Sequence, residues 1–322
     1  MKRALILLSG IALLLASCAR KLDLDAEMEA GEAVCWMTDL ADDTPVARLS
    51  IPGAHDAASA SITAWTRWTR TQELSVAGLW NFGVRAFDLR PAWVDGELGI
   101  YHETYSAHVT FPQVMHALIL ALEKHPGECA IVLVRHEEEA DGNDPGWASA
   151  MGSYVDSIRD HLVAYRSGIT LGEMRGKILI LSRNEYAGGP IGGYLRGWTS
   201  GDDPDRQQSA SILCEDGTSA PFWVQDYYHP DGLTDKWAQI QGLLDATASA
   251  SEPFPLVVNH VSGYTGSLPD YRDNARNVNK KTASALTGSP SGILMLDFAG
   301  VEKSKGVEVG GATLVKEVVG NN

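Results

Sequence analysis

The sequence predicts an α/β fold in which eight mainly parallel strands close into a barrel. Short apolar runs of strand length alternate with longer runs of helical periodicity, which is typical of a parallel sheet. Eight runs have strand character, the strand number of a closed parallel barrel. A polar residue stands where most strands end, at the edge where such barrels carry their sites. These residues are His55, Arg90, Arg135, Arg183, Asp226 and Asp297.

The composition fits one globular domain and limits its partners. The 322 residues are 44% apolar and 21% charged, which is enough to build a full hydrophobic core. The net charge of −15 argues against nucleic acid as a partner, because little is left to neutralise a phosphate backbone. It also argues against recruitment to an anionic membrane by a basic patch. We expect a monomer.

The start of the chain has the pattern of an export signal. Residues 1–17 combine two basic residues, an apolar run and small residues before Cys18. The tetrapeptide ending at Cys18 resembles the bacterial lipobox, in which the cysteine is lipidated; an ordinary secretion signal is the alternative. Residues 18–40 are acidic and are expected to form a solvated tether, followed by the barrel at 41–322. We therefore expect an exported bacterial lipoprotein anchored to the cell envelope through Cys18.

The first strand is expected at residues 46–51, just before the stretch that we regard as central. Pro52 and Gly53 should end this strand, because proline lacks an N–H and glycine allows unusual backbone angles. His55 and Asp56 follow at once, and an imidazole beside a carboxylate on a rigid support suits general base catalysis. A helix N-cap or a surface pair is the alternative for these two residues.

The next elements make the barrel irregular. Residues 59–81 have the spacing of one or two short helices, and residues 83–90 form the next predicted strand. Alternation places Asp88 and Arg90 on the same face, where they can form an ion pair. The following strand leads to His102 and comes too soon for a crossover helix. An open doubly wound sheet is the alternative fold.

The remaining elements alternate regularly. The other strands are continuous apolar runs, as in sheets buried on both faces, and are expected at 130–134, 177–181, 222–225, 256–260 and 292–296. Helices are expected at 112–124, 147–165, 234–248 and 274–286, and a polar, glycine-rich loop at 187–208. Cys129 opens an apolar strand and should be a buried thiol. A Cys35–Cys214 disulfide is left open, because spacing alone does not establish it.

The strand ends would bring two histidines, three arginines and several carboxylates into one pocket. The sequence lacks a Gly-x-Ser-x-Gly elbow, a phosphate-binding glycine loop and a His-Glu-x-x-His helix. Two histidines and an arginine suit phosphodiester cleavage. One histidine takes a proton from an attacking hydroxyl, the other gives one to the leaving oxygen, and the arginine holds the phosphate oxygens. No protein nucleophile is needed if the substrate carries a hydroxyl beside the phosphate.

Several short motifs, in order between about residue 47 and Asp297, carry a resemblance to a known family. They are Ser50-Ile51-Pro52-Gly53-Ala54-His55-Asp56, Thr71-Gln72-Glu73, Gly83-Val84-Arg85-Ala86-Phe87-Asp88-Leu89-Arg90, Tyr101-His102, Gln225-Asp226-Tyr227-Tyr228 and Leu296-Asp297. The chain resembles bacterial phosphatidylinositol-specific phospholipase C, the family of the phospholipase C X-box domain. The resemblance implies an irregular TIM-like (β/α)8 barrel as a single catalytic domain. It implies phosphatidylinositol, and with it glycosylphosphatidylinositol anchors, as substrates at a membrane surface.

The resemblance also implies a role for each matching residue. His55 would be the general base on the inositol 2-hydroxyl, and His102 the general acid toward the diacylglycerol oxygen, giving inositol cyclic phosphate and diacylglycerol. Asp297 would orient His55. Asp56 would support His102, and Arg90 would bind the phosphate. The substrate-binding residues would be Arg183, Asp226, Tyr228, Arg135 and Asp88.

Three positions refine the resemblance. Calcium-dependent relatives carry an acidic ligand where Arg90 stands, so the arginine predicts no metal and no cofactor. Arg135 stands where the bacterial enzymes have lysine, and Glu103 follows His102 where glycine is expected, so substrate choice would shift. Trp68 resembles a membrane-contacting tryptophan, with a buried helix tryptophan as the alternative.

Other interpretations stay open at this point. Arg135 and Arg183 could be structural ion pairs at strand ends, Asp226 could be a turn residue, and the other histidines are expected to be structural or exposed. A metal-dependent glycerophosphodiesterase-like hydrolase would need a carboxylate cluster where Arg90 stands, and activity in EDTA would argue against it. A non-catalytic surface lipoprotein that binds an inositol or glycan headgroup would show binding without turnover.

Overall fold

A computed structural model describes residues 23–201, 210–266 and 268–322. The expected export signal and the expected lipidation site, Cys18, lie outside the described residues. The acidic segment is described from residue 23 onward, and there it is not a solvated tether. Helix α1 (Leu24–Ala30) buries Leu24 and Met28, one helical turn apart, in the core shared with the other helices. The chain therefore joins the folded body before residue 41.

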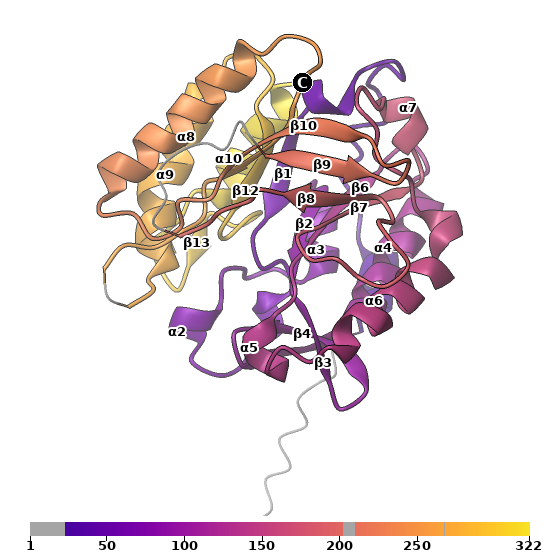
Figure 1. Cartoon of the computed structure of the whole chain (residues 1–322). Helices are drawn as coiled ribbons and strands as arrows, with labels where there is room; N and C mark the ends of the chain where they lie inside the picture. Colours follow the sequence, from indigo (N-terminus) through magenta and orange to yellow (C-terminus); the bar gives the residue numbers. More distant parts are fainter. Residues whose placement is uncertain (1–22, 202–209, 267) are drawn as a thin grey trace, which may run out of the picture.

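Nine strands of the described residues close into one barrel, which confirms the predicted barrel and excludes the open sheet (Figure 1). They are β1 (Ser50–Ala54), β2 (Ala86–Leu89), β6 (Ala130–Val134), β7 (Ile178–Ser182), β8 (Gly193–Arg196), β9 (Ser211–Cys214), β10 (Ser219–Gln225), β11 (Leu256–His260) and β12 (Gly292–Leu296). Their order is β1-β12-β11-β10-β9-β8-β7-β6-β2. Neighbours are parallel except that β9 runs antiparallel to β8 and β10.

The third predicted strand is not part of the barrel. β4 (Glu97–His102) instead pairs antiparallel with β3 (Pro91–Val94) and β5 (Tyr105–Thr110) in a separate three-stranded sheet. Antiparallel neighbours need only a tight turn, here at Asp95 and Gly96, which both have positive φ. The connection that is too short for a crossover helix is therefore a hairpin.

Two barrel strands arise where none was predicted. β8 lies inside the expected loop at 187–208, and β9, at residues 211–214, pairs with it. A tight turn joins β9 to β10: Gly217 has a φ of 81°, and the Cys214 N–H donates to the Thr218 carbonyl at 2.9 Å. Asp-Gly between two apolar runs is a strong hairpin signal. Sequence analysis missed it because β9 is only four residues long.

The first barrel strand begins later than predicted and continues through the residues expected to end it. Val46–Arg48 form a short 3-10 helix, and β1 includes Pro52 and Gly53. The Pro52 carbonyl faces the β2 side, where it accepts from the Arg85 N–H, and pairing with β2 begins only at Gly53. The missing proline N–H therefore breaks no ladder bond. A glycine fits at position 53 because a Cβ there would lie 2.3 Å from the Met295 sulfur on β12, so that the methionine would have to shift.

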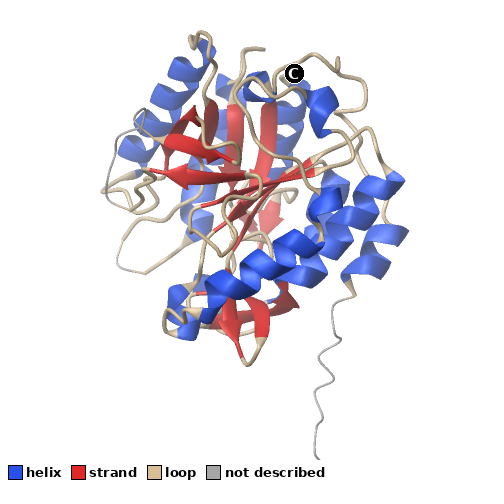
Figure 2. Cartoon of the chain, turned by 45° about the vertical axis from the view of Figure 1, so that its right-hand side comes forward, coloured by secondary structure: helices blue, strands red, loops and turns tan. Residues whose placement is uncertain are grey.

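Helices cover the outside of the barrel (Figure 2). The helices after α1 are α2 (Thr66–Thr69), α3 (Val76–Phe82), α4 (Phe111–Lys124), α5 (Glu138–Asp141), α6 (Gly146–Ser157), α7 (Leu171–Met174), α8 (Leu233–Ala248), α9 (Tyr271–Ala285) and α10 (Gly311–Gly320), with a two-stranded ribbon of β13 (Lys303–Ser304) and β14 (Val307–Glu308). The short helices α2 and α5 lie beyond one end of the barrel, toward the sheet that contains β3 and β4 (Figure 1). The helix expected at 147–165 ends at Ser157, because Val163 already donates to the Ile178 carbonyl of β7. No helix in the described ranges is long and apolar enough to span a membrane.

Two apolar cores lie on either side of the barrel wall. In β6, Val132 and Val134 pack with the helices, whereas Ile131 and Leu133 belong to a second cluster that fills the barrel with residues such as Met295 of β12. Adjacent strand residues point to opposite faces, so a strand buried on both sides must be apolar throughout. The continuous apolar runs of the sequence have this cause.

The three cysteines of the described chain are free thiols, so the disulfide left open by the sequence does not form. Cys35 lies 3.3 Å from His125 Nδ1, whereas Cys214 belongs to the cluster inside the barrel. Cys129 is fully buried, as predicted.

Candidate active site

The inward-facing positions of the strands lead into the site. In β6, Ile131 and Leu133 point into the barrel, and Arg135 is the next position of the same parity. The same step of two leads from Met295 to Asp297. Because parallel strands share one carboxyl-terminal edge, such residues meet at one mouth of the barrel. The structure brings together there all six predicted strand-end residues: His55, Arg90, Arg135, Arg183, Asp226 and Asp297.

His55 lies between a carboxylate and a guanidinium. Its Nδ1 is 2.9 Å from Asp297 Oδ1, and its Nε2 is 2.9 Å from Arg90 Nη2. Because a guanidinium only donates, the second contact requires an unprotonated Nε2 and a ring proton on Nδ1. Burial opposes a charged ring, but Asp56 and Asp297 outweigh it and raise the pKa of His55 to about 9. A proton and the Arg90 N–H therefore compete for one strongly basic lone pair.

Asp56 lies between both histidines and Arg90. Its Oδ1 is 2.6 Å from Arg90 Nε. Its Oδ2 is 3.5 Å from His55 Nε2 and 3.6 Å from His102 Nδ1. Burial opposes the charge of this carboxylate, but Arg90 and the histidines outweigh it and hold the pKa of Asp56 well below its usual range. Asp56 is thus the carboxylate around which Arg90 and the two histidines gather.

The hydrogen bond that orients His102 comes from the backbone. The Thr69 carbonyl lies 2.9 Å from His102 Nδ1, closer than the Asp56 carboxylate at 3.6 Å. A carbonyl only accepts, so Nδ1 carries a proton. The predicted support of His102 by Asp56 is accordingly electrostatic in this geometry, and the hydrogen bond belongs to Thr69.

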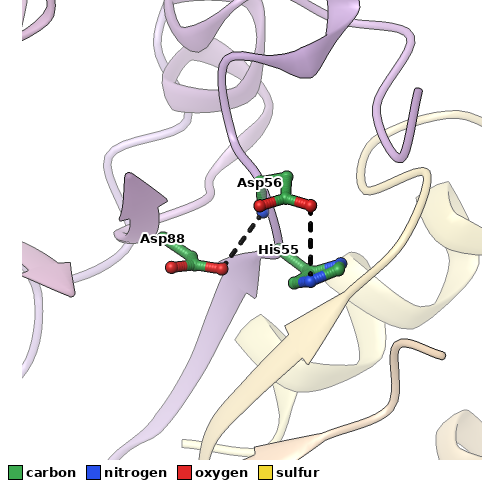
Figure 3. Close-up of side chains that lie close together, drawn as sticks. All are labelled: His55, Asp56 and Asp88. Carbon is green, nitrogen blue, oxygen red and sulfur yellow. Dashed lines mark hydrogen bonds and ion pairs between the residues drawn. The ribbon is translucent and has the colours of Figure 1, made fainter. Parts of the chain in front are cut away.

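Arg90 occupies a potential cation site. Within the described ranges, one group of side chains has metal-ligand spacing: His55, Asp56 and Asp88, whose ligand atoms lie within 4.8 Å of one another (Figure 3). Arg90 contacts all three, since its Nη2 is also 3.4 Å from Asp88 Oδ2. Burial opposes its charge, but Asp56 and Asp88 hold the pKa of Arg90 well above the usual value. The guanidinium stands where a metal ion would have to bind.

A cavity of about 180 Å³ opens above this cluster. The residues that sequence analysis singled out in its lining are His55, Arg90, His102, Glu103, Arg135, Arg183, Asp226 and Tyr228. Residues that it did not single out are Glu137, Glu139, Ser200, Gly263, Tyr264, Pro269 and Tyr271. Asp56, Asp88 and Asp297 stay below the lining and reach it through His55 and Arg90.

A second polar group forms the far wall of the cavity. Asp226 accepts a 2.9 Å hydrogen bond from Trp198 Nε1 and lies 3.8 Å from Arg183 Nη1. The Arg183 guanidinium lies over the Trp198 ring, 4.4 Å from its centroid. Burial lowers the pKa of Arg183 to about 10 although Asp226 opposes this. These contacts hold the Arg183 guanidinium and the Asp226 carboxylate in place at the cavity. Asp226 therefore lines the cavity, which the alternative of a simple turn residue does not require.

Sequence analysis missed two buried polar residues of the site. Glu137 is 2% exposed, and burial raises its pKa to about 8 although Arg90 and Arg135 oppose this. His260 ends β11 with its ring centroid 5.8 Å from that of His55, and burial lowers its pKa to about 4. His260 had a usable signal, because it follows the inward-facing Val258 by two positions. We had expected a structural or exposed histidine there.

No model of a known protein family matches the sequence. A curated protein does: the 1-phosphatidylinositol phosphodiesterase of Listeria monocytogenes is 31% identical over 161 residues, 46% of this chain and 48% of that protein. The match thus spans about half the length of the curated relative.

Solved structures match nearly the whole chain. The phosphatidylinositol-specific phospholipase C from Listeria monocytogenes has a TM-score of 0.69 at 23% identity, over 89% of this chain and 97% of its own. That of Staphylococcus aureus, from work on modulation of its membrane binding, has a TM-score of 0.72 at 19% identity, over 92% and 99%. The fold is that of phosphatidylinositol-specific phospholipase C.

Two more residues named by the sequence, Glu103 and Trp68, have these surroundings on the phospholipase C fold. Glu103 follows His102 with a φ of 53°, a conformation that favours glycine, and its carboxylate lines the cavity. Trp68 is half-buried, so the buried alternative is wrong, and its ring stacks on that of Trp65 at 5.3 Å. Trp65 is 61% exposed and is the more prominent of the two, although sequence analysis named only Trp68.

A larger hollow of about 850 Å³ lies elsewhere on the phospholipase C fold, between the β3–β4 hairpin and α6. Its lining contains one carboxylate, Glu97, and no histidine, arginine or lysine. It therefore lacks the histidines and arginines that line the cavity at the mouth of the barrel.

Proposed function

We propose that this protein cleaves the phosphodiester bond of phosphatidylinositol by transfer to the inositol 2-hydroxyl. One observation carries the proposal: His55 and His102 flank a single Asp56–Arg90 ion pair at one cavity. A base, an acid and a phosphate-binding fork in one place are what this transfer needs. The name of the curated relative, 1-phosphatidylinositol phosphodiesterase, supports the choice of substrate.

Bond formation to the inositol oxygen and loss of the diacylglycerol oxygen occur in a single step. When the phosphate takes the Arg90 N–H groups, Nε2 of His55 is free to accept the proton of the inositol 2-hydroxyl. The oxygen forms a bond to phosphorus, and the bond from phosphorus to the diacylglycerol oxygen breaks. His102 gives the proton on its Nε2 to that leaving oxygen while Nδ1 stays bonded to the Thr69 carbonyl, so that inositol cyclic phosphate and diacylglycerol result. Asp297 holds Nδ1 of His55, which stabilises the imidazolium as it forms.

The far wall of the cavity supports recognition of the inositol ring. Arg183 and Asp226 offer fixed donors and acceptors for ring hydroxyls, and Tyr228 offers an exposed aromatic face. Arg135 lines the same cavity and replaces the lysine of the resembling enzymes. Glycosylphosphatidylinositol anchors share the same phosphodiester and are included in the proposal as further substrates.

We also propose that the reaction needs no metal. The Arg90 guanidinium supplies positive charge among His55, Asp56 and Asp88, the group that a metal-dependent hydrolase would use. A metal ion there would meet the guanidinium at close range, which is electrostatically unfavourable. This argues against the glycerophosphodiesterase-like alternative.

The test is release of water-soluble inositol cyclic phosphate from phosphatidylinositol vesicles in EDTA. Wild type should release it, and His55→Ala and His102→Ala should not. The matched control is His116→Ala, because His116 is exposed and paired only with Asp25 on the outer helices. Binding of vesicles by folded wild type without release would favour a headgroup-binding protein. Release only with added calcium would favour the metal-dependent hydrolase.

Export and membrane docking belong to the proposal as well. We infer an exported lipoprotein anchored through Cys18, which Cys18→Ser should leave without labelled fatty acid in the native host. The stacked Trp65 and Trp68 support contact with a bilayer, because exposed aromatic rings suit the membrane interface. A monomer is sufficient for this arrangement, and sedimentation would check it.

A further inference from the structure

The segment Thr71-Gln72 has no role yet, although it lies next to the proposed base. It enters the structure from the loop between α2 and α3, and both residues are fully buried. Its position is the gap between the carboxyl-terminal ends of β1 and β12. Those two ends carry His55 and Asp297.

The strand ladder does not by itself fix these two residues. β1 and β12 pair in parallel up to Ala54 and Leu296, and one further bond runs from the His55 N–H to the Leu296 carbonyl at 3.0 Å. The chain then turns away sharply, because Phe298 has a φ of 56°, which is uncommon for a bulky residue. Ladder bonds therefore stop where the His55–Asp297 contact begins.

The Gln72 side chain bridges this gap. Its Nε2 donates to the His55 carbonyl and to the Leu296 carbonyl, both at 2.8 Å. Its Oε1 accepts from the Ala299 N–H at 3.0 Å. One buried amide thus uses both N–H groups and its oxygen to join the residue that carries the base to the turn that carries Asp297.

Neighbouring contacts hold the bridge in place. Thr71 Oγ1 donates to the His55 carbonyl at 2.9 Å, and the Thr71 carbonyl accepts from the Phe298 N–H at 2.6 Å. The hydroxyl of Ser59 accepts from the N–H groups of both Thr71 and Gln72 at 3.1 Å. The amide of Gln72 therefore has little freedom to turn.

We propose that Gln72 is a positioning residue that fixes the His55–Asp297 pair by tying the two strand ends together. It touches neither the reacting atoms nor the cavity lining, and it acts through the backbones of His55 and Leu296. A base is effective only when its lone pair is aimed at the proton, and small displacements cost rate steeply. The proposal rests on the proposed function for its kinetic consequence, but its structural consequence is measurable without substrate.

The structural consequence appears in the pKa of His55. The charged and titratable groups facing this ring are Asp56, Asp297, Asp88, Arg90, His260 and Tyr271. Asp297 is one of the two groups that raise the pKa, and it does so through a 2.9 Å contact. If the strand ends separate, this contact lengthens and the pKa of His55 falls toward the ordinary value of 6.5.

The experiment compares Gln72→Met with a control at the other end of the same strand. Methionine keeps the length of the side chain and removes all three hydrogen bonds. Asn321→Leu is the match, because buried Asn321 also makes three: to Ser50 Oγ, the Ser289 carbonyl and the Gly288 N–H. Both variants should lose stability, but only Gln72→Met removes hydrogen bonds next to His55.

Two measurements decide the outcome. In NMR titration, Gln72→Met should lower the pKa of His55 while Asn321→Leu leaves it unchanged. On phosphatidylinositol, kcat should fall roughly tenfold to a hundredfold in Gln72→Met with KM unchanged. Equal pKa values and equal kcat per folded molecule in both variants would overturn the proposal. If Gln72→Met does not fold, Thr71→Val, which removes one donor to His55, should shift the pKa in the same direction by less.

The two proposals fail separately. A shifted pKa in Gln72→Met together with an inactive wild type would leave the positioning role standing and refute phosphatidylinositol cleavage. An active wild type with an unshifted pKa and unchanged kcat in Gln72→Met would do the reverse.

Discussion

Replacing Arg90 by lysine tests the geometry of the guanidinium separately from its positive charge. The guanidinium places Nε 2.6 Å from Asp56, Nη2 2.9 Å from His55, and Nη1 3.8 Å from Glu137. A lysine offers one nitrogen on a flexible stem and cannot reach these partners together with a phosphate. Arg90→Lys therefore keeps the positive charge and loses the fork.

The expected magnitude follows from these contacts. Loss of one fixed donor to the developing charge costs about 10²–10³ in kcat, or about 2.7–4 kcal/mol of transition-state stabilisation. Complete removal of a buried charge costs about 3–5 kcal/mol of folding free energy. Because lysine retains the charge between Asp56 and Asp88, Arg90→Lys should lose less stability than this while losing most of its activity.

The assay is cyclic phosphate release in EDTA, with unfolding in urea measured alongside. The control is Arg85→Lys, because Arg85 is fully buried, pairs with Glu128 at 2.9 Å and lies at the opposite end of β2 from Arg90. The control should lose stability and keep its activity per folded molecule. Full activity of Arg90→Lys in EDTA would refute the role assigned to the fork.

Three further predictions use other parts of the structure. Burial lowers the pKa of Lys236 to about 7, so the penalty of burying its charge is complete below pH 7 and is relieved as the pH rises toward 10.5. Urea unfolding should show wild type gaining stability relative to Lys236→Met across that window, and a constant difference would contradict this. Trp65→Ala should weaken vesicle binding in a sedimentation assay and leave cleavage of a soluble inositol phosphodiester unchanged; loss of both would point to a folding defect. Gly53→Ala should lower the free energy of unfolding in urea by about 1–3 kcal/mol, because its Cβ would collide with Met295. An unchanged free energy of unfolding would show that the Met295 side chain moves aside without cost.

The strand-end residues were predictable because two local rules suffice for them. Side chains alternate across a strand, and parallel strands share one edge, so a polar residue two positions beyond an inward-facing residue reaches the common mouth. His55, Arg90 and Asp297 obey both rules, and the structure brings them within hydrogen-bonding distance. The same parity would have found His260, had it been applied to β11.

The local pattern of apolar residues likewise predicted the fold class and the apolar strands. The third predicted strand is present as β4 but was wrongly assigned to the barrel, and β8 was missed within the expected loop at 187–208, because strand periodicity carries no information about the partner. A run such as β4 or β9 can pair parallel or antiparallel, and its neighbours decide which.

Only the tertiary structure decided which partner each polar group takes. The sequence places Gln72 more than two hundred positions from Leu296, and nothing local encodes the bond between them. Likewise, His102 Nδ1 donates its hydrogen bond to the backbone carbonyl of Thr69, a group that every residue type possesses. Sequence alone determined that His55, His102 and Arg90 meet at one end of a barrel. The folded chain decided how they are held, because backbone carbonyls and buried amides find their partners through space and leave no periodic trace.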